Sequence, residues 1–182
     1  TAPLHASLED TELLSYFKNK NITLEVYKTI LDRFYSFHAP LEQQLHSYFG
    51  DQVSVVDYLE RRKSEALLSD LHYLKASYGY VLHLEPSPYL PIVQSMSHAF
   101  GCLYVLEGST LGGQIISRVL KDNLGLGPEN GASYFNGYGS STGEKWKMFC
   151  AAITQYSAMA GQDDRIVAAA NDTFIKLKMT LQ

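Results

Sequence analysis

The chain has 182 residues, of which 46% are hydrophobic and 19% are charged, and its formal net charge is −4. This balance is typical of a folded globular domain and excludes a disordered chain. The weakly negative charge gives no argument for binding nucleic acid, and no apolar run reaches the roughly 18 residues needed to cross a bilayer. The sequence therefore predicts one domain over residues 1–182, with neither nucleic acid nor a membrane as a partner.

The first half of the chain predicts helices separated by short breaks, since apolar residues recur at helical spacing. A long helix is expected to begin after Thr23, its N-cap, and to end at Gly50. Pro40 falls inside this stretch and is expected to kink or divide it. A further helix is predicted over residues 55–78, with the basic residues 61–63 on its solvated face.

The second half continues the helical pattern after a proline-rich loop. A long helical stretch interrupted by glycines is predicted over residues 92–123, and a loop rich in Gly, Asn and Ser over residues 125–143. Two last helices are predicted over residues 142–160 and 164–181. Because no stretch alternates as a strand does, the fold class is predicted to be all-α, a single helical bundle.

Glycines gather in one part of this pattern. Ten of the thirteen lie between residues 101 and 143, and Gly108, Gly112 and Gly113 interrupt a segment that otherwise favours helix. Each interior glycine costs a helix about 1 kcal/mol relative to alanine. Gly108 and Gly112 are one turn apart, so they share a bare face. Either a second helix packs closely against that face, or a flat ligand lies on it.

Several segments resemble haem oxygenases. The run Glu107–Gln114 resembles the distal helix of that family and, extended back to Leu103, is most similar to the bacterial branch that includes enzymes found beside bacteriophytochromes. Thr1–Glu9 is similar to the family's proximal segment, Tyr35–Glu42 to its second long helix, and Tyr138–Trp146 to the loop after the distal helix. The resemblance implies haem b bound between a proximal N-terminal helix and a glycine-rich, kinked distal helix.

The proximal segment supplies the metal ligand in this family. The resemblance implies that His5 binds the haem iron, as a neutral imidazole commonly does. Glu9 lies one helical turn later, where its carboxylate can accept a proton from the other ring nitrogen and orient the ring. The alternative is an ordinary histidine near the N-terminus, with Glu9 on a solvated face.

The distal segment supplies the candidate catalytic residues. The resemblance implies that the close backbone at Gly108 and Gly112 presses bound oxygen toward the ring edge, and that Gly113 also contacts haem. Ser109 stands where the animal enzymes carry Asp. A serine can hold a water molecule for proton delivery but cannot act as a carboxylate. Alternatively, Ser109 is a polar residue facing a neighbouring helix.

The haem propionates and ring require further contacts. By position in the family, Lys147 is expected near the haem edge as a cation for one propionate, whereas the next basic position of the family is Ala151 here. Phe174 matches an aromatic residue that packs on haem, and Tyr104 is placed to reach a propionate or the water network. Lys147 as a surface lysine and Phe174 as plain core are the alternatives.

The function implied by the resemblance is oxidation of haem to biliverdin, carbon monoxide and ferrous iron. O2 is the co-substrate, an external donor such as a ferredoxin or a reductase supplies electrons, and a bacteriophytochrome is a possible user of biliverdin. The alternative is a haem carrier or sensor without turnover, which Ser109 and the single propionate cation would favour. A di-iron oxidase is disfavoured because the chain has no Glu-x-x-His pair.

The two cysteines help to predict the cellular compartment and to judge a thiaminase-like function as an alternative. Cys102 and Cys150 are far apart in sequence and form neither a CxxC pair nor a disulfide framework. They are predicted to be reduced, mostly buried thiols, and no signal-peptide pattern is visible, so a cytoplasmic protein is expected. A thiaminase-like protein needs a nucleophilic cysteine, but nothing beside Cys102 indicates a lowered thiol pKa.

Overall fold

The structure is a computed structural model, and it describes residues 1–50 and 56–182. The described residues form helices and no strand, which confirms the predicted all-α fold. The helices are α1 (Ala2–Glu9), α2 (Glu12–Lys18), α3 (Leu24–Phe49), α4 (Ser64–Tyr78), α5 (Met96–Gly108), α6 (Gly113–Leu124), α7 (Ser133–Asn136), α8 (Thr142–Ala160) and α9 (Asp163–Thr180). Short 3-10 helices are η1 (Tyr58–Arg61), η2 (Ser109–Gly112) and η3 (Gly139–Ser141).

The long helix α3 begins as predicted. Thr23 is its N-cap, and the Thr23 hydroxyl accepts a hydrogen bond from the Val26 amide at 3.3 Å. The expected division at Pro40 does not occur, and α3 continues through it. Because proline has no amide hydrogen, Pro40 cannot donate the helical hydrogen bond to the Ser36 carbonyl one turn earlier. The amide of Ser87, in the extended segment after α4, donates to that carbonyl at 2.9 Å instead.

The next predicted helix is shorter than expected. The prediction over residues 55–78 begins at residue 55, which lies outside the described residues, while η1 and then α4 occupy the later part. The assignment of residues 61–63 to a solvated face is wrong for two of the three. Arg61 is 3% exposed and Lys63 is 5% exposed. Both cations face inward because a buried carboxylate lies between them, as described below.

The glycine-rich stretch divides into α5, η2 and α6. Ser95 caps α5, so the helix starts after the predicted residue 92. A Cβ at Gly113 would overlap the Phe135 carbonyl, and one at Gly101 would lie within 3 Å of the Ile166 carbonyl in α9. Close packing through small residues therefore explains Gly101 and Gly113. It does not explain Gly112, where a Cβ would meet nothing within 4 Å.

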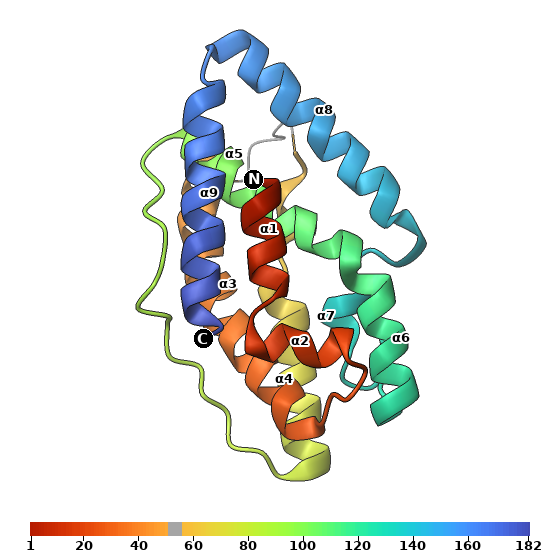
Figure 1. Cartoon of the computed structure of the whole chain (residues 1–182). Coiled ribbons are helices and arrows are strands. Elements are labelled where there is room, and N and C mark those ends of the chain that lie inside the picture. The colour runs from red at the N-terminus through yellow and green to blue at the C-terminus, as the bar shows by residue number, and fades with distance from the viewer. Residues whose placement is uncertain (51–55) are drawn as a thin grey trace.

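The packing of the helices leaves a space beside the bend. Figure 1 shows α1 lying along α9, with α5 crossing from α9 toward α6, which lies on the other side of α1. The helix α5 packs mainly on α9, and α3 packs on α4. The segment predicted as a loop over residues 125–143 contains the short helices α7 and η3, and α7 lies between α4 and α6. Among the described residues, no helix is both long enough and apolar enough to span a membrane.

Candidate functional site

A cavity of about 230 Å³ lies between α1 and the bend that joins α5 to α6. Its walls are mainly apolar, with a few polar groups. The lining residues are His5, Leu8, Glu9, Leu14, Phe34, Val105, Gly108, Ser109, Leu111, Gly112, Ile116, Tyr134, Phe135, Phe174 and Leu177. The structure thus brings the predicted proximal pair, the predicted distal residues 108, 109 and 112, and the predicted aromatic residue to one cavity.

The proximal wall carries the histidine. His5 Nδ1 lies 3.8 Å from a carboxylate oxygen of Glu9, with the two side chains 49% and 53% exposed. The His5 ring also packs edge-on against Phe174, with the ring centroids 5.9 Å apart. The carboxylate thus faces Nδ1 and favours a proton there, which makes Nε2 the ring nitrogen suited to bind a metal.

The distal wall is formed largely by backbone. Gly112 lines the cavity, and a Cβ at that position would point into open space. A Cβ at Gly108 would meet only the Trp146 ring, at the ordinary contact distance of 3.8 Å. A flat ligand can therefore approach the helix backbone at Gly112, whereas a bulky side chain at Gly108 would meet Trp146.

Polar groups of the distal wall are few. The Ser109 hydroxyl donates to the Leu106 carbonyl at 2.7 Å, which is a bond within its own helical turn. Beside Ser109, Tyr134 of α7 lines the cavity, and its hydroxyl lies 3.2 Å from Nε2 of His38. The sequence analysis missed Tyr134 because it falls in the segment predicted as a loop, and it assigned His38 no role in the site.

Some of the predicted haem contacts lie away from this cavity. Tyr104 packs on Trp146 and lines a second cavity of about 410 Å³ between α5, α8 and α9. Lys147 is exposed on α8 and is not among the described residues that line either cavity. Gly113 packs against the α7 backbone. The haem contacts assigned to these three residues remain predictions.

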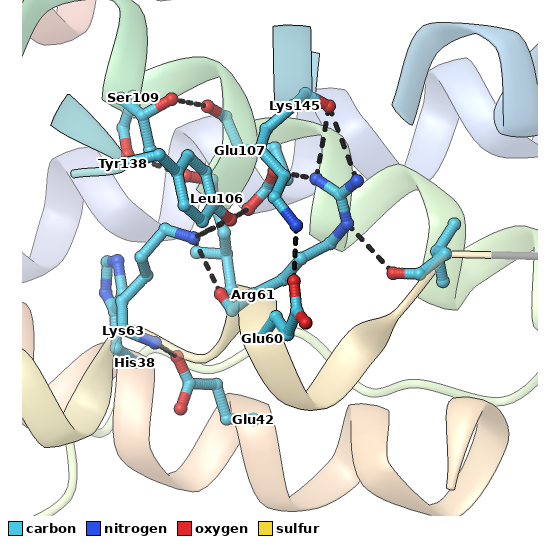
Figure 2. A network of polar contacts seen from close by, with 12 residues as sticks. His38, Glu42, Glu60, Arg61, Lys63, Leu106, Glu107, Ser109, Tyr138 and Lys145 are labelled. Atoms are coloured by element: carbon cyan, nitrogen blue, oxygen red, sulfur yellow. Dashed lines mark hydrogen bonds and ion pairs between the residues drawn. The ribbon is translucent and has the colours of Figure 1, made fainter. Parts of the chain in front are cut away.

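A buried ionic network fixes the helix just before the bend (Figure 2). Glu107 is 1% exposed, and its carboxylate pairs with Arg61 and, at 2.6 Å, with the Lys63 ammonium. The Tyr138 hydroxyl donates to the same carboxylate at 2.7 Å. Burial lowers the pKa of Lys63, an effect that the charge of Glu107 opposes. Glu107 thus links η1 and the segment before α8 to the C-terminal end of α5, directly before Gly108.

The network reaches α8 through Arg61. Its guanidinium donates to the Lys145 carbonyl, with both terminal nitrogens at 3.3 Å, and to the Val56 carbonyl at 2.8 Å. The sequence carried one signal for the network. Glu107 is an acidic residue inside an apolar helical stretch, and such a carboxylate needs a partner if it is buried.

The fold and the cavity together define the class of protein. It is an all-α domain in which an N-terminal histidine faces a glycine-bent helix across a narrow cavity. The family model described as "Heme oxygenase" matches residues 1–181, and the chain belongs to the haem oxygenase family. A relative named "Heme oxygenase" from Xanthomonas campestris pv. campestris (strain 8004) is 29% identical over 150 residues, which cover 82% of this chain and 85% of the relative.

Solved structures support the fold. The haem oxygenase of Leptospira interrogans superposes with a TM-score of 0.77 at 18% identity, covering 100% of this chain and 94% of that one. Heme oxygenase-1 of Synechocystis sp. PCC6803, solved in complex with heme, superposes with a TM-score of 0.73 at 17% identity, covering 100% of this chain and 86% of that one. The predicted helical bundle of the haem oxygenase type is therefore confirmed.

Proposed function

We propose that this protein binds haem through His5 and cleaves it oxidatively to biliverdin, carbon monoxide and ferrous iron. The observation that carries the proposal is that His5 of α1 lines the same cavity as Gly108 and Gly112 of the bend. Membership of the haem oxygenase family supports an oxidoreductase. We also propose, by resemblance, that the chain is closest to the branch associated with bacteriophytochromes.

The residues present fit a haem group. An imidazole and a largely apolar slot with glycine on one side suit an iron porphyrin. The cavity of about 230 Å³ is below the range of roughly 300–1,000 Å³ typical of ligand pockets, so haem requires the slot to widen. The helix α1 suits this movement, because it is short, mostly exposed, and packs on α9 and α2.

Each wall has its own task in this proposal. His5 holds the iron through Nε2, and Glu9 holds the ring in the required tautomer. Phe174 packs on His5 and fixes the ring plane. Gly108 and Gly112 would let the distal backbone approach a bound porphyrin closely. When bound, haem supplies the iron that activates O2 and is itself the molecule oxidised.

The remaining partners are part of the same proposal. Lys147, as a cation for one propionate, and Tyr104, with Gly113 near the ring, are proposed as further haem contacts on the resemblance alone. Electrons come from an external donor such as a ferredoxin or a reductase, since the chain carries no dinucleotide fingerprint. A cytoplasmic location and a bacteriophytochrome as the user of biliverdin are proposed on the resemblance alone.

A haem carrier without turnover is the second candidate. The observation that favours it is the Ser109 hydroxyl, which is already engaged with the Leu106 carbonyl. The two candidates separate when the protein is mixed with haem, O2 and ascorbate. Loss of the Soret band with formation of biliverdin supports the oxygenase, whereas a stable haem complex that only autoxidises supports the carrier.

The His5→Ala variant tests the metal ligand. Loss of the imidazole should abolish the iron–histidine stretch in the Raman spectrum of the ferrous complex and stop biliverdin formation. His72→Ala is the matched control, because His72 is exposed on α4 and lines neither cavity. Unchanged haem spectra in His5→Ala would assign the iron to another residue.

A further inference from the structure

A polar chain leads from the distal wall into the core. Ser109 and Tyr134 line the cavity, and the Tyr134 hydroxyl lies 3.2 Å from Nε2 of His38. His38 lies in the middle of α3, is 1% exposed, and does not itself line the cavity. The orientation of the bond between His38 and Tyr134 decides whether the tyrosine offers the cavity a hydrogen or a lone pair.

The His38 ring is neutral. Burial, with a smaller effect from the charge of Lys63, lowers the pKa of His38 to about 3. A neutral imidazole carries one N–H group, so one ring nitrogen is a donor and the other is an acceptor. The charged and titratable groups around this ring are thus the ammonium of Lys63 and the phenol of Tyr134.

The position of that single proton follows from the surroundings. Nδ1 has no hydrogen-bond partner in close geometry among the described residues. The Phe34 carbonyl, one turn earlier in α3, favours a proton on the ring, and Nε2 is already beside Tyr134. The proton therefore belongs on Nδ1, and the Nε2 lone pair accepts the Tyr134 hydroxyl hydrogen.

The second hydroxyl of the wall is oriented in the same sense. Ser109 donates its hydrogen to the Leu106 carbonyl at 2.7 Å. Burial raises the pKa of Tyr134, and a hydrogen bond with the Ser109 side chain, the smaller effect, lowers it. Both hydroxyl hydrogens are thus engaged inside the protein, and the lone pairs remain for the cavity.

We propose that His38 is a positioning residue that makes the Tyr134 hydroxyl an acceptor of hydrogen bonds from the cavity, beside Ser109, whose hydrogen is engaged by the Leu106 carbonyl. The inference rests on the proposed binding of haem at this site. A wall of this kind favours a neutral water molecule in the distal space, because water has hydrogens to donate. It disfavours hydroxide, fluoride and other anions, which need a donor.

The apoprotein gives the first test, which does not depend on haem. Long-range proton–nitrogen NMR correlation with nitrogen-15-labelled histidine reads the tautomer of each ring, and His38→Gln assigns the signal. We expect His38 to carry its proton on Nδ1 at pH 7. A proton on Nε2 would overturn the proposal whatever the outcome for haem binding.

Fluoride titration of the ferric haem complex gives the second test. In His38→Phe the Tyr134 hydroxyl loses its acceptor and can donate into the cavity, so the fluoride Kd should fall about tenfold, as one additional hydrogen bond to an anion predicts. The double variant His38→Phe/Tyr134→Phe should return to the wild-type Kd. His72→Phe, on the exposed face of α4, should leave the Kd unchanged.

The single variant Tyr134→Phe keeps the test decisive if His38→Phe does not fold. Because the wild-type phenol donates nothing to the cavity, its removal should leave the fluoride Kd unchanged. A tenfold weaker affinity in Tyr134→Phe, or an unchanged affinity in a folded His38→Phe, contradicts the proposal. If the protein binds no haem at all, the proposed function fails, while the NMR result on the apoprotein still stands.

Discussion

The backbone carbonyl of Phe135 lies against Gly113, whereas Gly112 faces open space in the cavity. A methyl group at Gly113 forces α6 and α7 apart, and overpacking of this kind costs about 1–3 kcal/mol. A methyl group at Gly112 meets nothing, and alanine favours helix over glycine by up to about 1 kcal/mol. Urea unfolding of the apoproteins should therefore show Gly113→Ala destabilised and Gly112→Ala equal to or more stable than wild type.

The same pair of variants separates stability from ligand binding. Gly112→Ala should weaken haem binding although it folds well, and Gly112→Leu should weaken it further, because both side chains enter the distal space. Equal haem affinity in wild type and Gly112→Leu would show that the ligand does not lie on this backbone.

His38 gives the protein a defined sensitivity to acid. Its pKa is about 3 in the folded chain, against an ordinary value of 6.5. Below pH 6.5 His38 binds a proton in the unfolded chain but not in the folded chain. The free energy of unfolding therefore falls as the pH drops from about 6.5 toward 3. Between pH 7 and pH 5 this histidine alone should cost about 2 kcal/mol of unfolding free energy.

The measurement is the difference between wild type and His38→Gln in urea unfolding at pH 7 and pH 5. The glutamine has no proton to gain, so this part of the pH dependence should disappear, while His72→Gln on the surface should behave as wild type. A wild-type slope that survives in His38→Gln would mean that other groups cause the acid sensitivity.

At the scale of elements, the sequence predicts helices better than it predicts their ends. Thr23 shows that a helix start can be predicted when a side chain accepts a free amide of the first turn, whereas the equivalent cap Ser95 was overlooked and the start of α5 was predicted too early. The continuity of α3 through Pro40 was not readable, because it depends on the Ser87 amide, which arrives from a distant segment. The short helix α7 was missed because its contacts with α4 and α6 stabilise it.

The residues of the candidate site also fall into two groups, those that the sequence predicts and those that only the fold brings together. The resemblance to the haem oxygenase family predicted the site residues that line one cavity, because the segments that carry them match the family's segments in sequence: His5, Glu9, Gly108, Ser109, Gly112 and Phe174. Tyr134 and His38 come from segments far apart in the sequence and meet only through folding. Arg61 and Lys63 were predicted on a solvated face because their ion-pair partner Glu107 is distant in the sequence and meets them only in the folded chain.

The helix α1 is expected to gain the most order when haem binds. Its eight residues are too few for a stable isolated helix, and Leu8 is its buried residue. Hydrogen exchange of α1 amides should therefore be fast in the apoprotein and slow by about tenfold or more with haem. Mass spectrometry of pepsin fragments measures this, with the buried helix α3 as an internal reference. Equal exchange of α1 with and without haem would argue against a ligand on His5, and His5→Ala should lose the protection.

At the scale of the whole molecule, Glu107 joins segments that are distant in the chain. Arg61 and Lys63 come from the connection before α4, Tyr138 from the connection before α8, and Glu107 from the end of α5 (Figure 2). The network is buried, so its two cations depend chiefly on the Glu107 carboxylate for compensation, with a smaller effect of the Glu42 charge on Lys63. Removal of one partner from a buried ion pair typically costs about 3–5 kcal/mol, because the remaining charge stays buried.

Glu107→Gln should therefore lower the unfolding free energy by several kcal/mol, since two buried cations lose their counter-charge. Glu60→Gln is the matched control: Glu60 pairs with Lys145 beside the same network, but its side chain is 64% exposed, and surface pairs contribute at most about 1 kcal/mol. Urea unfolding of both variants at pH 7 makes the comparison. Because the network holds the residue before Gly108, the folded fraction of Glu107→Gln should also bind haem more weakly, whereas Glu60→Gln should bind it as wild type does. Equal losses of stability in the two variants would show that burial of the network contributes nothing beyond an ordinary surface pair.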